Sequence, residues 1–220
     1  MALQLSQHTK QRVFPHKTIE RVAFFGYADS KPDDVEYRFA YDVAKLCAEN
    51  DFVVVDGGGP GVMEAASRGA KSANGKTIGV TFYPTGAKNF EGRAASNVLD
   101  EEIVTKNYLE RTLRLLEFGQ VYMIFNGGTG TLSEFAMAWG MARLYLGHHK
   151  PLVLCGKHWY EIVASLTHNM RIRDEEMGVF SVVDTPQEAM RELLGLQEEL
   201  KRTPYDPHYE IADDEKPFIL

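Results

Sequence analysis

Short, continuously apolar segments alternate with longer amphipathic segments along most of this chain. The first two read RVAFFGY at 21–27 and FVVV at 52–55, and later ones read VYMIF at 121–125 and PLVLC at 151–155. Strands that are apolar on both faces are typical of a parallel sheet with helices on both sides. Their alternation with helices indicates the α/β class. The sequence therefore predicts a doubly wound, Rossmann-like parallel sheet in a single domain.

The remaining elements follow from the same pattern. Further strands are expected at 76–82, 102–105 and 180–183, with a long loop at 83–99. Apolar positions at helical spacing predict the helices, which we place at 33–49, 62–73, 107–118, 132–146, 159–169 and 186–196.

A length of 220 residues suits one large domain. We expect a polar N-terminal arm at 1–18, a Rossmann-like nucleotide-binding domain at 19–197, and a charged, proline-containing C-terminal tail at 198–220.

Composition excludes several classes of function. The net charge of -7 argues against nucleic acid as a partner, because such binding needs basic patches. No apolar run approaches 18 residues, so no membrane partner is expected, and the polar residues 1–17 lack the apolar region of a signal peptide. Cys47 and Cys155 are isolated, which gives no support to a zinc or redox site. We expect a cytoplasmic protein with no metal and no cofactor.

The first glycine cluster, Gly57–Gly61, follows a predicted strand and opens a predicted helix. Ligands of open α/β sheets bind at this position, where glycines let backbone N–H groups approach an anion. The cluster is neither GxGxxG, because Val62 occupies the third glycine position, nor a P-loop. Gly58, Gly59 and Gly61 therefore either line a ligand site or form a tight turn.

The second cluster, Gly127–Glu134, reads GGTGTLSE. Three glycines and the hydroxyl groups of Thr129, Thr131 and Ser133, at the start of a helix, favour a phosphate site. The alternative is a capping box, in which Thr131 is the N-cap and Glu134 lies three residues on. The residues alone leave both interpretations open.

Arg111 lies on the helix at 107–118 with no carboxylate three or four residues away. A guanidinium without a local partner either serves a ligand or pairs with a distant residue of the fold. Both interpretations remain open.

These motifs together resemble the LOG-like Rossmann family, which includes cytokinin riboside 5′-monophosphate phosphoribohydrolases and relatives that cleave purine nucleotides. Gly127–Glu134 matches its GGxGTxxE signature, and the GGGPGVM at 57–63 and KTIGV at 76–80 are similar to its first glycine loop and following strand. The resemblance covers roughly 21–183.

The resemblance implies hydrolysis of a nucleoside 5′-monophosphate, a small-molecule nucleotide, to free base and ribose 5-phosphate. It implies that Glu134 and Arg111 are catalytic. The substrate-binding residues that it implies are Gly26, Gly58, Gly59, Gly61, Gly127, Gly128, Thr129, Gly130 and Thr131.

Several positions depart from the family pattern. Asn126 stands where the family has Pro, Thr112 where it has Lys, and Tyr27 and Ala28 where it has a pair of serines. This combination also resembles a sister branch that carries the molybdenum cofactor without hydrolysing nucleotides. The alternative function is therefore a non-catalytic binding or carrier protein for a phosphorylated cofactor.

Relatives in this family are dimers or larger, so we expect a homodimer or higher homo-oligomer. The helix at 132–146 carries Met137, Trp139, Met141 and Tyr145. These side chains either contribute to a subunit interface or pack in the core.

Overall fold

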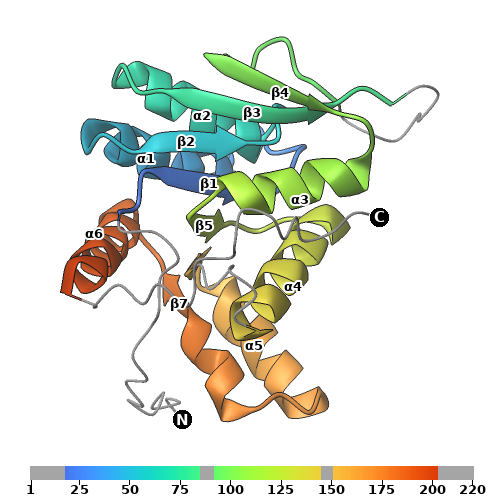
Figure 1. Ribbon diagram of the computed structural model, residues 1–220, viewed down its shortest axis with the longest axis vertical. Helices are drawn as coiled ribbons and strands as arrows, with labels where there is room; N and C mark the ends of the chain where they lie inside the picture. Colours follow the sequence, from blue (N-terminus) through green and yellow to red (C-terminus); the bar gives the residue numbers. More distant parts are fainter. Residues whose placement is uncertain (1–17, 85–91, 145–150, 203–220) are drawn as a thin grey trace, which may run out of the picture.

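The computed structural model describes residues 18–84, 92–144 and 151–202. Its centre is one sheet of seven strands, in the order β4-β3-β2-β1-β5-β6-β7 (Figure 1). All six neighbouring pairs are parallel. The strands are β1 (Arg21–Phe25), β2 (Val53–Asp56), β3 (Thr77–Phe82), β4 (Glu101–Thr105), β5 (Val121–Ile124), β6 (Leu152–Cys155) and β7 (Phe180–Val183).

Helices cover both faces of the sheet, which confirms the predicted doubly wound, Rossmann-like fold. One face carries α1 (Val35–Glu49), α2 (Val62–Ser72) and α6 (Pro186–Arg202), and the other carries α3 (Tyr108–Phe118), α4 (Thr129–Leu144) and α5 (His158–Asn169). A 3₁₀ helix that the sequence did not predict, η1 (Asp174–Val179), precedes β7.

The alternating directions of the β1 side chains explain why Val22–Phe25 are all apolar. In β1, Val22 and Phe24 point to the α1 side, and Ala23 and Phe25 point to the α3 side. Successive side chains of a strand face opposite sides of a sheet, and here both sides are buried. A strand in this setting cannot carry the polar positions of a half-exposed strand.

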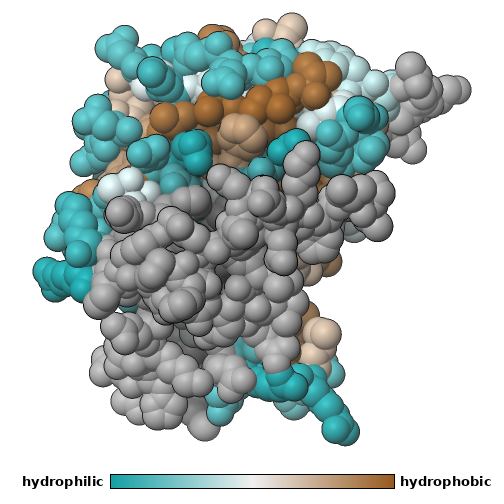
Figure 2. Space-filling model, viewed as in Figure 1, coloured by the Kyte–Doolittle hydropathy of each residue, from teal (hydrophilic) through white to brown (hydrophobic). Residues whose placement is uncertain are grey.

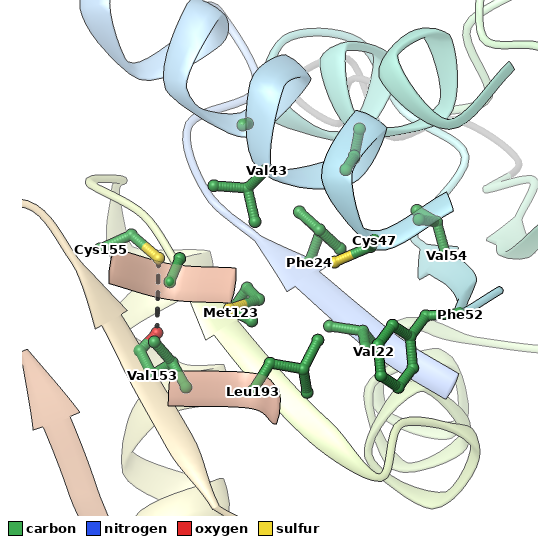
Figure 3. Close-up of a cluster of buried hydrophobic side chains, with 14 of the residues drawn as sticks. Val22, Phe24, Val43, Cys47, Phe52, Val54, Met123, Val153, Cys155 and Leu193 are labelled. Carbon is green, nitrogen blue, oxygen red and sulfur yellow. Dashed lines mark hydrogen bonds between the residues drawn. The ribbon is translucent and has the colours of Figure 1, made fainter. Parts of the chain in front are cut away.

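The two cysteines belong to the core on the α1 side, where Figure 3 shows Cys47 and Cys155 among hydrophobic side chains. Both thiols are free and buried. Burial raises the pKa of Cys47 to about 12, so this thiol stays neutral and unreactive. The Cys155 thiol contacts the Val153 carbonyl oxygen at 3.6 Å.

The large side chains of α4 pack inward. Met137, Trp139 and Met141 lie against the hydrophobic core on the α3 side, and Trp139 Nε1 donates to the Glu176 carbonyl oxygen at 2.6 Å. Core packing therefore accounts for these three residues, while Tyr145 lies outside the described residues.

The helix predicted at 186–196 ends too early, because α6 continues to Arg202 and includes 198–202. This segment is rich in Glu, Leu, Lys and Arg, which are strong helix formers. A Lys201–Glu198 pair at 2.7 Å and two basic residues in the last turn also favour the helix end. The predictions for 1–17 and 203–220 fall outside the described residues.

Two helical glycines give a matched test of this packing. A Cβ at Gly69 of α2 lies 2.1 Å from the Tyr41 backbone oxygen of α1, whereas a Cβ at Gly140 of α4 meets no described atom within 4 Å. We expect Gly69→Ala to lower the free energy of unfolding by about 1–3 kcal/mol through overpacking. Gly140→Ala should raise it by up to about 1 kcal/mol, because Ala is the better helix former. Urea unfolding measures both, and equal effects would contradict the close approach of α1 and α2.

Candidate active site

The strand order of the sheet changes direction between β1 and β5. From β1 the chain adds β2, β3 and β4 on one side, and from β5 it adds β6 and β7 on the other. The connections after β1 and β5 therefore run to helices on opposite faces, which opens a crevice at the carboxyl ends of these two strands. Ligands of doubly wound sheets bind at this switch point.

A cavity of about 390 Å³ occupies this crevice, a volume within the usual range for small-molecule sites. Its walls come from the loop after β1, the loop after β2, one side of α3 and the first turns of α4. It brings together most of the predicted site residues: Gly26, Arg111, Gly128, Thr129, Gly130, Thr131 and Glu134.

One wall of this cavity is the start of α4. The first turn of a helix has N–H groups without intrahelical acceptors, and here they belong to Thr129, Gly130 and Thr131. Gly128 and Thr129 are exposed, so an anion can reach this turn. The hydroxyl of Ser133 donates back to the Gly130 carbonyl oxygen at 2.7 Å, so it bonds within the helix.

The alternative interpretation of this motif, a capping box with Thr131 as N-cap, is wrong. Helix α4 begins at Thr129, three residues earlier than predicted. The Leu132 N–H already donates to the Gly128 carbonyl oxygen at 3.0 Å, which places Thr131 inside the first turn. Glu134 therefore has no N-cap partner at Thr131, and its side chain faces the cavity.

Arg111 is held by backbone carbonyl groups, and its guanidinium is buried. Its Nε donates to the Val80 oxygen at 3.1 Å, and its Nη2 donates to the Gly57 oxygen at 3.0 Å. The residue is 6% exposed. A Cβ at Gly57 lies 1.6 Å from Nη2, so only glycine allows this contact. The sequence analysis missed Gly57, although it opens the first glycine cluster.

Glu134 is 7% exposed. Burial raises the pKa of its carboxyl group to about 7, and the positive charge of Arg111 opposes this rise. Its carboxyl group accepts no hydrogen bond from the described part of the chain. A carboxyl group that titrates near neutral pH is suited to accept and return a proton.

Four predicted site residues do not line the cavity, namely Gly58, Gly59, Gly61 and Gly127. Gly58 and Gly61 have φ of 69° and 66°, which other residues rarely adopt. A Cβ at Gly61 lies 2.3 Å from the Tyr27 backbone oxygen. Gly58, Gly59 and Gly61 belong to the turn that joins β2 to α2.

The family departures divide into two groups. Tyr27 and Ala28 line the cavity, so they change its wall. Thr112 does not line the cavity; its hydroxyl donates to the Tyr108 oxygen of its own helix at 3.1 Å. Met63, the last residue of the motif at 57–63, also lines the cavity, as does Tyr108, which belongs to none of the predicted motifs.

The described residues contain no group of three or more His, Cys, Asp or Glu side chains that could hold a metal ion. The same residues include no helix with both the length and the apolar character needed to cross a membrane.

Fold and crevice together define a LOG-like Rossmann domain. A model of the SLOG cluster4 family matches residues 20–188, which is most of the chain, and the chain belongs to this family. The resemblance inferred from the glycine motifs is therefore confirmed.

Individual relatives cover this domain at moderate identity. An uncharacterized protein of Archaeoglobus fulgidus is 30% identical over 129 residues, covering 59% of this chain and 81% of its own length. The cytokinin riboside 5′-monophosphate phosphoribohydrolase of Mycobacterium tuberculosis is 30% identical over 131 residues, covering 58% and 67%. The solved molybdenum cofactor binding protein of Rippkaea orientalis is 27% identical with a TM-score of 0.59, covering 81% and 97%.

The raised pKa of Glu134 predicts pH-dependent stability. The folded state holds this proton more tightly than the unfolded chain, whose Glu pKa is 4.5. The free energy of unfolding therefore falls as pH rises from about 4.5 to about 7 and stays lower above that. Glutamine does not titrate, so Glu134→Gln removes this loss. The free energy of unfolding of the variant should exceed that of the wild type by roughly 3 kcal/mol at pH 8, but by little at pH 4.

Urea unfolding at the two pH values measures this difference. The control is Glu117→Gln on α3, because the Glu117 side chain is 56% exposed and should give a nearly constant difference. A constant difference for Glu134→Gln as well would show that this carboxyl group is not buried as described.

Proposed function

We infer that this protein hydrolyses the N-glycosidic bond of a nucleoside 5′-monophosphate, such as cytokinin riboside 5′-monophosphate or a purine nucleotide, to free base and ribose 5-phosphate. The observation that carries the proposal is a buried Glu134, near Arg111 and facing a cavity that also contains the start of α4. The 30% identity to a phosphoribohydrolase adds support.

The start of α4 binds the 5′-phosphate in this proposal. The N–H groups of the first turn donate to the phosphate oxygens, assisted by the helix dipole. Thr129 and Thr131 add hydroxyl groups. Gly26 and Gly57 line the cavity as well, so backbone forms part of the wall beside the ribose.

Cleavage breaks the C1′–N bond, and the electron pair leaves with the base. Positive charge then builds on the sugar, as in glycoside hydrolysis. The Glu134 carboxylate stabilises this charge and takes a proton from the water that attacks C1′. Glu134 then passes this proton to the departing base nitrogen, so one water is consumed and the products are free base and ribose 5-phosphate. Arg111 lowers the pKa of Glu134, which favours the ionised carboxylate before reaction.

A second candidate is carriage of a phosphorylated cofactor without turnover. It is supported by the 27% identity to the Rippkaea orientalis protein across 81% of this chain. The same helix start would hold the phosphate group, and Glu134 would then have no chemical role.

Release of ribose 5-phosphate from a panel of nucleoside 5′-monophosphates separates the two candidates. We expect Glu134→Gln and Arg111→Ala each to lower release by about 100- to 10,000-fold, because both remove groups that act in the transition state. Arg114→Ala is the matched control, since Arg114 lies on the same helix and pairs with Glu117 at 2.6 Å on the exposed side. No release from any nucleotide, with molybdenum retained through purification, would establish the carrier instead.

We also propose a homodimer in the cytoplasm. Figure 2 shows a hydrophobic band over β3 and β4, where Ile78 and Ile103 are only partly buried. A second copy of the chain can cover such a band.

The proposed cytoplasmic location rests on the cysteines. Two buried free thiols fit a reducing compartment. With a net charge of -7, nucleic acid is not a proposed partner.

Light scattering tests the dimer, which should have twice the 24.8 kDa of the chain. Ile103→Glu should shift the mass toward the monomer, because it places a charge in the band. Val104 is 60% exposed and projects from the opposite face of β4, so Val104→Glu should leave the mass unchanged. A monomeric wild type at micromolar concentration would contradict the proposal.

A further inference from the structure

Asp56 is a completely buried carboxylate that the reaction above does not use. It is the last residue of β2 and directly precedes Gly57. Its Oδ1 accepts from the Gly58 N–H at 2.6 Å, and its Oδ2 accepts from Ser67 Oγ at 2.5 Å. A buried acidic residue without such donors would be strongly destabilising.

A third donor comes from the segment that precedes β4. Asn97 Nδ2 donates to Asp56 Oδ1 at 3.1 Å and to the Gly59 oxygen at 2.9 Å. The Ala94 N–H donates to the Gly58 oxygen at 2.9 Å. The first glycine loop is therefore fixed at Gly58 and Gly59, on the side away from Arg111.

The Gly57 carbonyl oxygen is the part of this loop that reaches the active site. It accepts from Arg111 Nη2 at 3.0 Å. Gly57 lies between Asp56 and Gly58, which both belong to the hydrogen-bond network just described. These two neighbours set the position of the Gly57 carbonyl oxygen. A shift of the loop would move this acceptor and release one end of the Arg111 guanidinium.

Charge adds to this coupling. Burial raises the pKa of Asp56 to about 6, while the donors Ser67, Gly58 and Asn97 and the positive charge of Arg111 oppose the rise. Asp56 is thus mostly ionised at neutral pH, which helps to balance the buried cation.

We propose that Asp56 is a positioning residue, which clamps the first glycine loop through Gly58, Ser67 and Asn97 so that the Gly57 carbonyl oxygen orients Arg111 in the active site. The clamp acts through hydrogen-bond geometry. The consequence for activity rests on the proposed function, whereas the orientation of Arg111 does not.

Two variants separate geometry from charge. Asp56→Ala removes all three acceptor contacts. Asp56→Asn keeps the shape: its amide oxygen accepts from Gly58 and Asn97, and its NH₂ group donates to Ser67 Oγ, which can also act as an acceptor. The conservative variant therefore loses the charge and retains the clamp.

The primary readout is the set of Arg111 guanidinium N–H signals in ¹⁵N NMR spectra, assigned by their loss in Arg111→Lys. In the wild type these signals should exchange slowly with water. Asp56→Ala should make them exchange fast and lower ribose 5-phosphate release from the nucleotide that the wild type cleaves best by about 100-fold, the effect of a misplaced catalytic group. Asp56→Asn should restore slow exchange and most of the release.

A control and a double variant distinguish positioning from general stability. Gln120 is buried at the opposite end of the sheet, where its Oε1 accepts from the Glu20 and Arg21 N–H groups at 2.8 and 2.9 Å. Gln120→Ala should lower stability and leave the Arg111 signals unchanged. Combined with Arg111→Ala, Asp56→Ala should lower release no further, because residues that act through one another are not additive.

If Asp56→Ala does not fold, Asn97→Ala replaces it, because it frees Gly59 and keeps two donors on Asp56. It should speed exchange of the Arg111 signals. Unchanged Arg111 signals in the folded variant would overturn the proposal, as would equal losses in Asp56→Ala and Asp56→Asn. If the wild type releases no ribose 5-phosphate, the proposed function fails, and the NMR signals still decide the role of Asp56.

Discussion

The buried guanidinium of Arg111 organises the cavity end of this protein. A cation removed from water needs hydrogen-bond acceptors and negative charge close by. The acceptors are backbone oxygens of Val80 and Gly57, and the charge comes from the carboxylates of Asp56 and Glu134. These groups come from β2, β3 and α4, while Arg111 comes from α3. Four separate parts of the fold therefore meet around one side chain.

The sheet order explains why these parts meet at the carboxyl edge. Parallel strands all end on that edge, so the loops after β1, β2 and β5 are neighbours even though they are far apart in the chain. The hydrophobic core on the α3 side holds α3 and α4 against the strands. Arg111 and Glu134 are thus carried by rigid helices, which suits side chains that must keep a fixed geometry.

Much of the fold could be predicted, because burial of both sheet faces makes strands such as β1, β5 and β6 apolar and easily recognised. Contacts between distant residues could not be predicted from local patterns. Asp56 is 11 residues from Ser67 and 41 from Asn97, so no motif reveals its network. The start of α4 was misplaced because Thr131 and Glu134 have the spacing of a capping box, whereas the Gly128 carbonyl starts the helix. The sequence also could not distinguish the glycines that line the cavity from those that belong to the turn between β2 and α2; the structure makes this distinction.

The loop after β1 is fastened to its surroundings by its backbone. The Tyr27 N–H donates to the Asn126 oxygen at 2.9 Å, and the Tyr27 oxygen accepts from the Val62 N–H at 3.0 Å. Tyr27 itself is 47% exposed. The side chains at 27 and 28 therefore form part of the cavity wall without holding the fold together. Point substitutions at these two positions can alter which ligand is admitted at little cost in stability, so substrate range can diverge between relatives while the scaffold stays the same.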